Sequence, residues 1–133
     1  MRVEIIAEGF RARRGRACFG LFTSPQGFPD YGKRAFERAD ARIEDGQAYV
    51  CFDDLPDRPF AVSVLHDQDG DRRMRTGAFG IPREGFGVSR NPRIRFGPPR
   101  FGECAIPPAQ ELEVFIAIRY LSGRGRGPLA VPF

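Results

Sequence analysis

The fold class is decided by the stretch Leu112–Tyr120, which reads Leu-Glu-Val-Phe-Ile-Ala-Ile-Arg-Tyr. Every second side chain in it is apolar or aromatic, and Glu113 and Arg119 lie among the residues between them. Successive side chains of a strand point to opposite faces of a sheet, so this alternation is typical of a strand with one face on a core. The stretch predicts a β-strand over 112–120 and an all-β fold.

Similar patterns predict strands elsewhere in the chain. The N-terminal segment alternates from Val3 to Glu8, although Ile6 interrupts its polar side. Residues 17–22 are apolar or small throughout, which is typical of a strand that is buried on both faces and central in its sheet. A further strand is predicted over 60–66, after a turn.

Two further elements are predicted between these strands. The pair Asp45-Gly46 supplies the positive φ angles of a two-residue hairpin turn, which predicts that 42–44 pairs with 47–52. Residues 33–39 are expected to form two helical turns. The side chains of that helix expected to face inward are Ala35, Phe36 and Ala39.

Length and composition indicate one domain. The 133 residues, 41% of them hydrophobic, suit a single core, and the 16 glycines and 12 prolines disfavour long helices. Strands separated by turn signals, without a βαβ rhythm, predict one antiparallel β-sandwich of about seven strands. We assign 1–121 to this sandwich, with one long irregular loop over 66–101, and 122–133 to a tail.

Charge and cysteine content identify no partner. The net charge of +4 comes with a single lysine, Lys33, among 21 basic residues, which is more typical of genomic composition than of a phosphate-binding surface. The cysteines, Cys18, Cys51 and Cys104, form no Cys-x-x-Cys zinc unit. We expect three buried or half-buried thiols, with one disulfide in an exported form as the alternative.

The sequence leaves the localisation open. No apolar run is long enough to cross a bilayer, and no export signal opens the chain, so we expect a soluble protein. An exported protein written from its mature start would look the same.

Several motifs resemble those of a known bacterial family. They are Asp54-Leu55-Pro56, Phe60-Ala61-Val62, His66-Asp67, Gly80-Ile81-Pro82-Arg83-Glu84-Gly85-Phe86-Gly87-Val88-Ser89 and Phe96-Gly97-Pro98-Pro99-Arg100-Phe101. Over about residues 2–120 the chain resembles the bacterial domain family of unknown function 2141 (DUF2141). The resemblance implies an immunoglobulin-like or transthyretin-like β-sandwich whose members are often exported. It implies no biochemical role, because none is established for the family.

The same resemblance suggests a calcium loop that begins in the His-Asp motif. Family members tend to continue this motif as Asp-x-Asn-x-Asn-Gly-x-x-Asp, and Asp67, Asp69 and Asp71 occupy the first three ligand positions here. Alternating short acids suit Ca²⁺, because a turning backbone brings several hard oxygen ligands together. Arg72 and Arg75 stand where the pattern has glycine and the closing acid. We therefore predict no cofactor and favour a metal-free turn, or a guanidinium group in place of the ion, with bound Ca²⁺ as the alternative.

No catalytic constellation is recognised by spacing. His66 is the only histidine, and on an alternating strand we expect it to be half-buried and hydrogen-bonded to the backbone. The serines show no nucleophile-elbow pattern. The acids near Asp53 lie ~20 Å from Asp67 along an extended strand, farther apart than paired catalytic carboxylates. We predict that the protein is not an enzyme and name no catalytic or cofactor-binding residue.

Nucleic acid is not expected as a partner. Residues 72–100 carry eight arginines and one acid, Glu84, with phenylalanines between them. This mixture suits base stacking and phosphate neutralisation. We favour phenylalanines that hold a long loop on the sandwich, because the family motifs already account for Phe79 and Phe86.

The tail is compatible with docking onto this or another protein. A flexible Gly/Arg spacer ends in the apolar pentapeptide 129–133, which is compatible with a groove or a sheet edge as its binding site. Its partner-binding residues would be Leu129, Val131 and Phe133. Ordinary terminal disorder is the favoured interpretation, and docking is the alternative to it.

These observations favour a non-enzymatic β-sandwich binding or interaction module, with the 66–101 loop as its functional surface. The alternative is a structural subunit whose tail or sheet edges join neighbouring copies or a partner protein.

Overall fold

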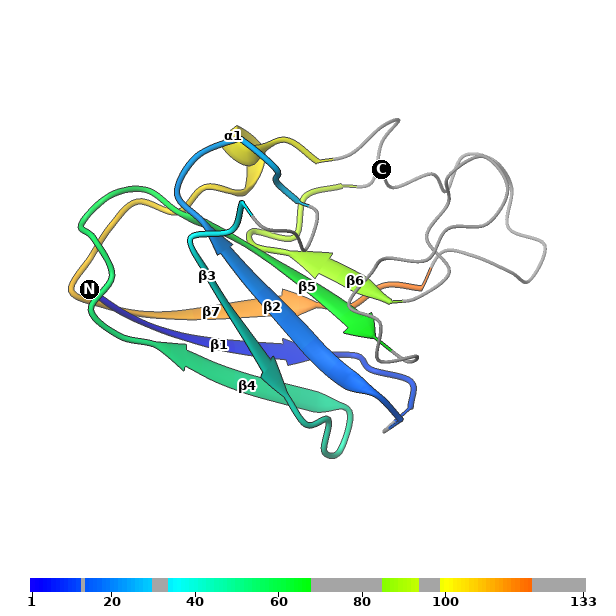
Figure 1. The fold of residues 1–133 in the computed structure, drawn as a ribbon. Helices are drawn as coiled ribbons and strands as arrows, with labels where there is room; N and C mark the ends of the chain where they lie inside the picture. Colours follow the sequence, from blue (N-terminus) through cyan, green and yellow to red (C-terminus); the bar gives the residue numbers. More distant parts are fainter. Residues whose placement is uncertain (13, 30–33, 68–84, 94–98, 121–133) are drawn as a thin grey trace.

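The computed structural model describes residues 1–12, 14–29, 34–67, 85–93 and 99–120. In chain order the elements are β1 (Arg2–Glu8), β2 (Arg16–Phe22), β3 (Glu37–Ala41), β4 (Gln47–Phe52), β5 (Ala61–Asp67), β6 (Phe86–Val88), α1 (Phe101–Cys104) and β7 (Glu111–Ala117). The strands form sheet A, with the order β4-β1-β7, and sheet B, with the order β3-β2-β5-β6 (Figure 1). The predicted all-β sandwich of about seven strands is confirmed. Within the described residues no helix is long and apolar enough to span a membrane.

Sheet A departs in one strand pair from the predicted antiparallel arrangement. β1 pairs antiparallel with β4 but parallel with β7, so that Ile5 has Val50 on one side and Val114 on the other. A parallel pair requires a long connection, and nearly the whole chain lies between β1 and β7 (Figure 1). The two ends of the described chain are therefore joined side by side in one sheet.

The core lies between the sheets and is built from alternate residues of the strands. In β1 the inward side chains of Val3, Ile5 and Ala7 are fully buried. In β7, Val114 and Ile116 are buried while their neighbours point to solvent. The alternation predicted for these two strands is confirmed.

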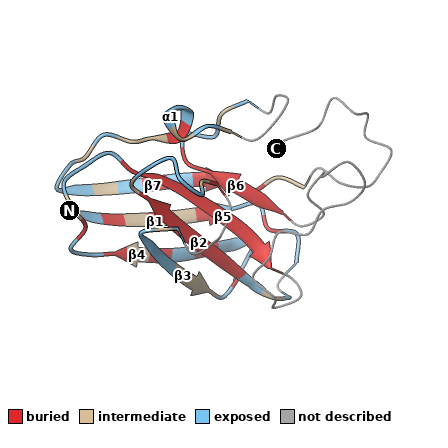
Figure 2. Ribbon diagram, turned by 45° about the horizontal axis from the view of Figure 1, so that its top comes forward, coloured by how far each residue is buried: buried red, intermediate tan, exposed pale blue. Residues whose placement is uncertain are grey.

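The two central strands of sheet B, β2 and β5, are buried on both faces. β2 is buried at all positions after Arg16, and β5 is buried at all positions (Figure 2). On the outer face, Phe22 packs edge-on against Phe28, which packs edge-on against Phe101 at the start of α1. The prediction that β2 is central and doubly buried is confirmed.

The predicted helix over 33–39 is wrong. Residues Glu37–Ala41 form β3, paired antiparallel with β2, and Phe36 is 49% exposed instead of facing inward. The Phe36 N–H donates to the carbonyl of Leu21 at 2.7 Å, which extends this pairing. A helix of two turns makes few internal hydrogen bonds, whereas pairing with a central strand satisfies the backbone groups directly.

The Asp45-Gly46 turn forms as predicted, but the hairpin around it does not. Both residues have positive φ angles, 52° and 76°. Glu44 and Gln47 exchange two backbone hydrogen bonds of 2.9 Å, and the pairing ends there. Since β3 belongs to sheet B and β4 to sheet A, the chain crosses between the sheets at this turn.

The segment expected to be irregular contains β6, and β6 connects the two sheets. The Ile118 N–H still donates to the Glu8 carbonyl of β1, at 2.8 Å. The next residue, Arg119, exchanges two backbone hydrogen bonds with Phe86 of β6, at 2.8 and 3.0 Å. The chain thus passes from sheet A to sheet B directly after β7, which closes this side of the sandwich.

Replacing Gly87 by alanine is expected to destabilise the fold. An added Cβ would lie 2.6 Å from Ile116 Cγ2 and 2.8 Å from the Ala117 carbonyl oxygen, where a backbone must shift to make room. We expect Gly87→Ala to lower the free energy of unfolding by about 1–3 kcal/mol, measured by urea denaturation. In the matched control, Gly102→Ala, the added Cβ meets no atom within 4 Å. Equal denaturation midpoints for the two variants would contradict this account.

Candidate functional site

His66 lies near the end of β5 with both ring nitrogens hydrogen-bonded. Nε2 is 2.8 Å from the Arg14 carbonyl oxygen, and Nδ1 is 2.8 Å from the Tyr120 hydroxyl. A carbonyl oxygen only accepts, so Nε2 carries the proton, and in the neutral ring Nδ1 accepts from Tyr120. The hydroxyl of Tyr120 accepts in turn from the Arg11 N–H at 2.9 Å. These hydrogen bonds join three segments of the chain at one end of the sandwich.

The surroundings of this chain of hydrogen bonds keep its members uncharged. Phe10 packs edge-on against the His66 ring, with centroids 5.3 Å apart, and the His66 side chain has no exposed surface. Burial lowers the pKa of His66 and raises the pKa of Tyr120. The Arg11 guanidinium lies 4.5 Å from the centre of the Tyr120 ring, a cation–π contact. The predicted backbone hydrogen bond of His66 is confirmed, and the residue is more deeply buried than expected.

Asp67, the first residue of the predicted calcium loop, is buried on the opposite face of β5 from His66. Its Oδ2 lies 3.9 Å from the Sγ of Cys18, and it stands opposite Arg16 in the register of β2 and β5. Within the described residues, His, Cys, Asp and Glu side chains form no group of three that would hold a metal ion.

The other predicted binding residues lie outside the described residues. They are Asp69 and Asp71 of the loop, and Leu129, Val131 and Phe133 of the tail. The calcium loop and the docking of the tail therefore stay predictions.

The three cysteines are free thiols, as expected for small buried or half-buried side chains. Cys18 and Cys104 are buried, and Cys51 is half-buried. Burial raises the pKa of Cys104 to about 12, which keeps this thiol protonated at neutral pH.

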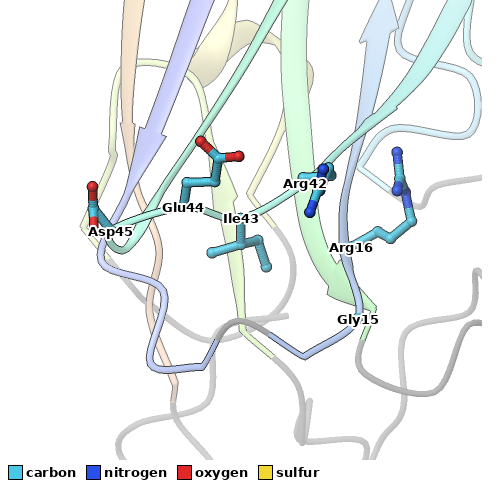
Figure 3. Close-up of a pocket in the computed structure, with 6 residues that line it drawn as sticks. All are labelled: Gly15, Arg16, Arg42, Ile43, Glu44 and Asp45. Carbon is cyan, nitrogen blue, oxygen red and sulfur yellow. The ribbon is translucent and has the colours of Figure 1, made fainter.

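A hollow of about 480 Å³ lies between the start of β2 and the turn before β4 (Figure 3). Its lining residues are Gly15, Arg16, Arg42, Ile43, Glu44 and Asp45. The two arginines lie on one side in Figure 3 and the two acids on the other. Two positive and two negative groups give no preference for either sign of ligand, so we assign no ligand to this hollow.

The outer face of sheet A presents two exposed aromatic rings in one row. Tyr49 of β4 and Phe115 of β7 both stand opposite Ile6 of β1, one on each side. Tyr49 is 52% exposed, Phe115 is 55% exposed, and Ile6 is half-buried. Side chains directly opposite on paired strands are ~5 Å apart, so the three form a continuous apolar row across the sheet. Exposed and buried residues alternate along these strands, in contrast to the central strands β2 and β5 of sheet B (Figure 2).

Four carboxylates lie at other outward positions of β1 and β7, three of them directly next to the row and Glu111 one outward position farther along β7. They belong to Glu4, Glu8, Glu111 and Glu113. One basic side chain of β1, that of Arg2, shares the face and pairs with Glu4 at 3.0 Å and with Asp53 at 3.3 Å. The face is therefore negative, although the whole chain has a net charge of +4. We call this surface, made of the row and its four glutamates, the acidic aromatic face.

The chemistry of the acidic aromatic face suits a partner that is both apolar and basic. Aromatic rings bind apolar groups and cations, and carboxylates form forked hydrogen bonds with guanidinium groups. Contiguous exposed apolar side chains rimmed by polar ones often mark a protein contact surface. Periodicity shows Ile6 and Phe115 as apolar residues on the polar sides of their strands. It does not show that they adjoin, because they come from opposite ends of the chain.

Comparison with known proteins shows a family but no activity. The family model described as "Uncharacterized protein conserved in bacteria (DUF2141)" matches residues 5–114. Serine/arginine-rich splicing factor 4 of Homo sapiens is 34% identical over 82 residues, which cover 54% of this chain and 16% of that protein. The chain thus spans only a small part of this curated protein. No solved structure matches the chain significantly.

The stability of the fold is expected to fall as the pH is lowered through the titration range of His66. Burial lowers its folded pKa below the ordinary value of about 6.5, so between these two values only the unfolded chain binds the proton. Urea denaturation at pH 7.5, 6.5 and 5.5 should show this loss, and His66→Gln should have a smaller slope. The chain has no other histidine, so NMR titration of its single imidazole reports the folded pKa directly. Greater stability at pH 5.5 than at pH 7.5 would contradict the assignment.

Removing the Tyr120 hydroxyl is expected to weaken the fold. Tyr120→Phe leaves the Arg11 N–H and His66 Nδ1 without this partner, which costs about 1–3 kcal/mol in the free energy of unfolding. Tyr49→Phe is the matched control, because it removes a hydroxyl from a half-exposed ring. Guanidinium denaturation of both variants tests the difference, and an equal loss in both would show that the Tyr120 contacts add nothing.

Proposed function

The chain belongs to the DUF2141 family of uncharacterized bacterial proteins, and we propose that it is a non-enzymatic β-sandwich interaction module. The observation that carries this proposal is the row of Tyr49, Ile6 and Phe115 on the outer face of sheet A. The central strands of sheet B, in contrast, are covered on both faces. The segment 66–101 remains a second proposed surface for binding.

The free energy gained by burying the two exposed rings can be compared with the cost of association. Covering the exposed half of an aromatic side chain buries on the order of 100 Å² of surface, or about 2.5 kcal/mol at ~25 cal/mol per Å². Two rings contribute about 5 kcal/mol, which is comparable with the lower estimates, about 4 kcal/mol, of the cost of association. The four glutamates are therefore needed to add charge-assisted contacts and to select a basic partner.

Two observations support the non-enzymatic part of the proposal. Both ring nitrogens of His66 form hydrogen bonds within the fold, so neither is available to take a proton from a substrate. The thiol of Cys104 has a raised pKa, which makes it a poor nucleophile at neutral pH.

The alternative function is assembly of neighbouring copies through the tail or through sheet edges. The edge of β7 is partly occupied, because the Asn91 side chain donates to the Phe115 carbonyl at 3.1 Å and accepts from the Ala117 N–H at 2.9 Å. This side chain takes the hydrogen bonds that an added strand would make there. The outer strand β6 is also partly occupied, because Phe86 pairs with Arg119. Strand addition is therefore favoured at β3 or β4, the two remaining outer strands.

A peptide titration tests the proposed binding surface. We expect Arg-Leu-Arg-Leu-Arg-Leu, added to ¹⁵N-labelled full-length protein, to shift the amide resonances of β1, β4 and β7. The same peptide with glutamate in place of arginine should shift them little, because the face is acidic. The double variant Tyr49→Ser/Phe115→Ser should weaken binding at least tenfold, since it removes both exposed rings.

The matched control for this titration is Phe36→Ser, which removes a similarly exposed ring away from the acidic aromatic face. It should bind the basic peptide like the unmodified protein. Equal binding of the arginine and glutamate peptides, or undiminished binding by the double variant, would show that this face is not the binding surface.

A further inference from the structure

We propose that the acidic aromatic face binds the C-terminal segment 122–133 of a second copy of this chain. This inference rests on the proposed function and names the partner. The segment reads Ser-Gly-Arg-Gly-Arg-Gly-Pro-Leu-Ala-Val-Pro-Phe and combines, within twelve residues, the basic and apolar side chains that the face requires.

The apolar part of the segment matches the row in length and periodicity. Leu129, Val131 and Phe133 occupy alternate positions, so in an extended peptide their side chains project to one side. At ~3.3 Å per residue they span about 13 Å. The row crosses two inter-strand spacings, or about 10 Å from Tyr49 to Phe115. One extended peptide can therefore cover the whole row.

The charges of the segment complement those of the face. Arg124 and Arg126 precede the apolar residues, at a distance that lets them reach the glutamates beside the row. Forked hydrogen bonds between guanidinium and carboxylate groups add direction to the contact. A symmetric dimer through the same face is disfavoured, because it would bring the four glutamates of one copy against the four of the other.

The path of the chain after β7 favours a second copy over docking in cis. Arg119 is paired with β6 and Tyr120 is bonded to His66 of β5, so the chain leaves on the side of sheet B. A return to Phe115 on the far face needs ~17 Å back along β7 and ~10 Å through the thickness of the sandwich. The eight residues 121–128 have a root-mean-square span of only about 16 Å as a flexible chain. Docking in cis would require this spacer to span about 20 Å in a straight line, more than its root-mean-square span, and to pass around the edge of sheet A.

Each copy then offers one tail and one face, which makes the contact heterologous. Such head-to-tail contacts generate rings if the rotation closes and open filaments if it does not. The predicted association increases with protein concentration and weakens with added salt, because charge pairs contribute to it.

Reversing the charges of the face and of the tail, first separately and then together, tests the inference in the full-length protein. Sedimentation velocity at increasing concentration should show association of the unmodified chain. Glu111→Arg/Glu113→Arg should reduce the association constant at least tenfold, and so should Arg124→Glu/Arg126→Glu. The four substitutions combined should restore association, since the charge pairs form again with opposite signs. The matched control Glu37→Arg/Asp57→Arg changes the charge equally at exposed carboxylates away from the face and should associate more than the face variant does.

The outcomes separate this inference from the proposed function. A full-length chain that stays monomeric, or whose association survives both charge reversals, overturns the docking of the tail. If the Arg-Leu peptide still binds the acidic aromatic face in that case, the interaction module stands with a different partner. If the Arg-Leu peptide does not bind the face, or binds it equally well after the ring substitutions, both the docking of the tail and the proposed binding surface are overturned.

Discussion

The passage of the chain from sheet A to sheet B directly after β7 is the constraint on which the rest of the structure depends. Ile118 still hydrogen-bonds to β1, whereas Arg119 is already paired with Phe86 of β6. This exchange needs the two backbones to approach closely, and Gly85 and Gly87 permit it. A Cβ on Gly85 would lie 2.6 Å from the ring of Tyr120, and a Cβ on Gly87 would lie 2.6 Å from Cγ2 of Ile116. Two small residues therefore allow one side of the sandwich to close.

The same passage places Tyr120 against the end of β5. Its hydroxyl accepts from the Arg11 N–H and meets His66, whose other nitrogen bonds to the Arg14 carbonyl. Buried polar groups are costly unless they are paired, and here each of them finds a partner at the end of the core. A histidine that would be a candidate base on an open surface is thus a structural link between the N-terminal loop, β5 and the end of β7.

The closure of the sandwich after β7 also makes the outer faces of the two sheets different. Sheet B carries the crossing segments, and Phe28, Phe101 and Cys104 pack as a second small core against its outer side. Sheet A keeps an outer face with the exposed rings of Tyr49 and Phe115 and a surplus of carboxylates. On a chain of positive net charge this negative face has its own local field, which favours the approach of positively charged groups.

Local patterns were sufficient for the strands whose two faces differ and for the turn at Asp45-Gly46. Alternation of apolar and polar residues predicted β1 and β7, and an unbroken run of apolar or small residues predicted β2. These patterns are informative because the direction of successive side chains follows from covalent geometry alone. Two strands were beyond such reasoning. β3 is a polar outer strand without a clean alternation, and β6 has three residues, so each exists only through pairing with a neighbour.

The acidic aromatic face shows the same division. The sequence by itself determined that Ile6 and Phe115 are apolar residues on the polar sides of their strands. Only the tertiary structure decided that they adjoin and that Tyr49 completes the row. The physical reason is that register between distant strands depends on packing of the whole core and on the entropy of closing long loops, which no local window contains.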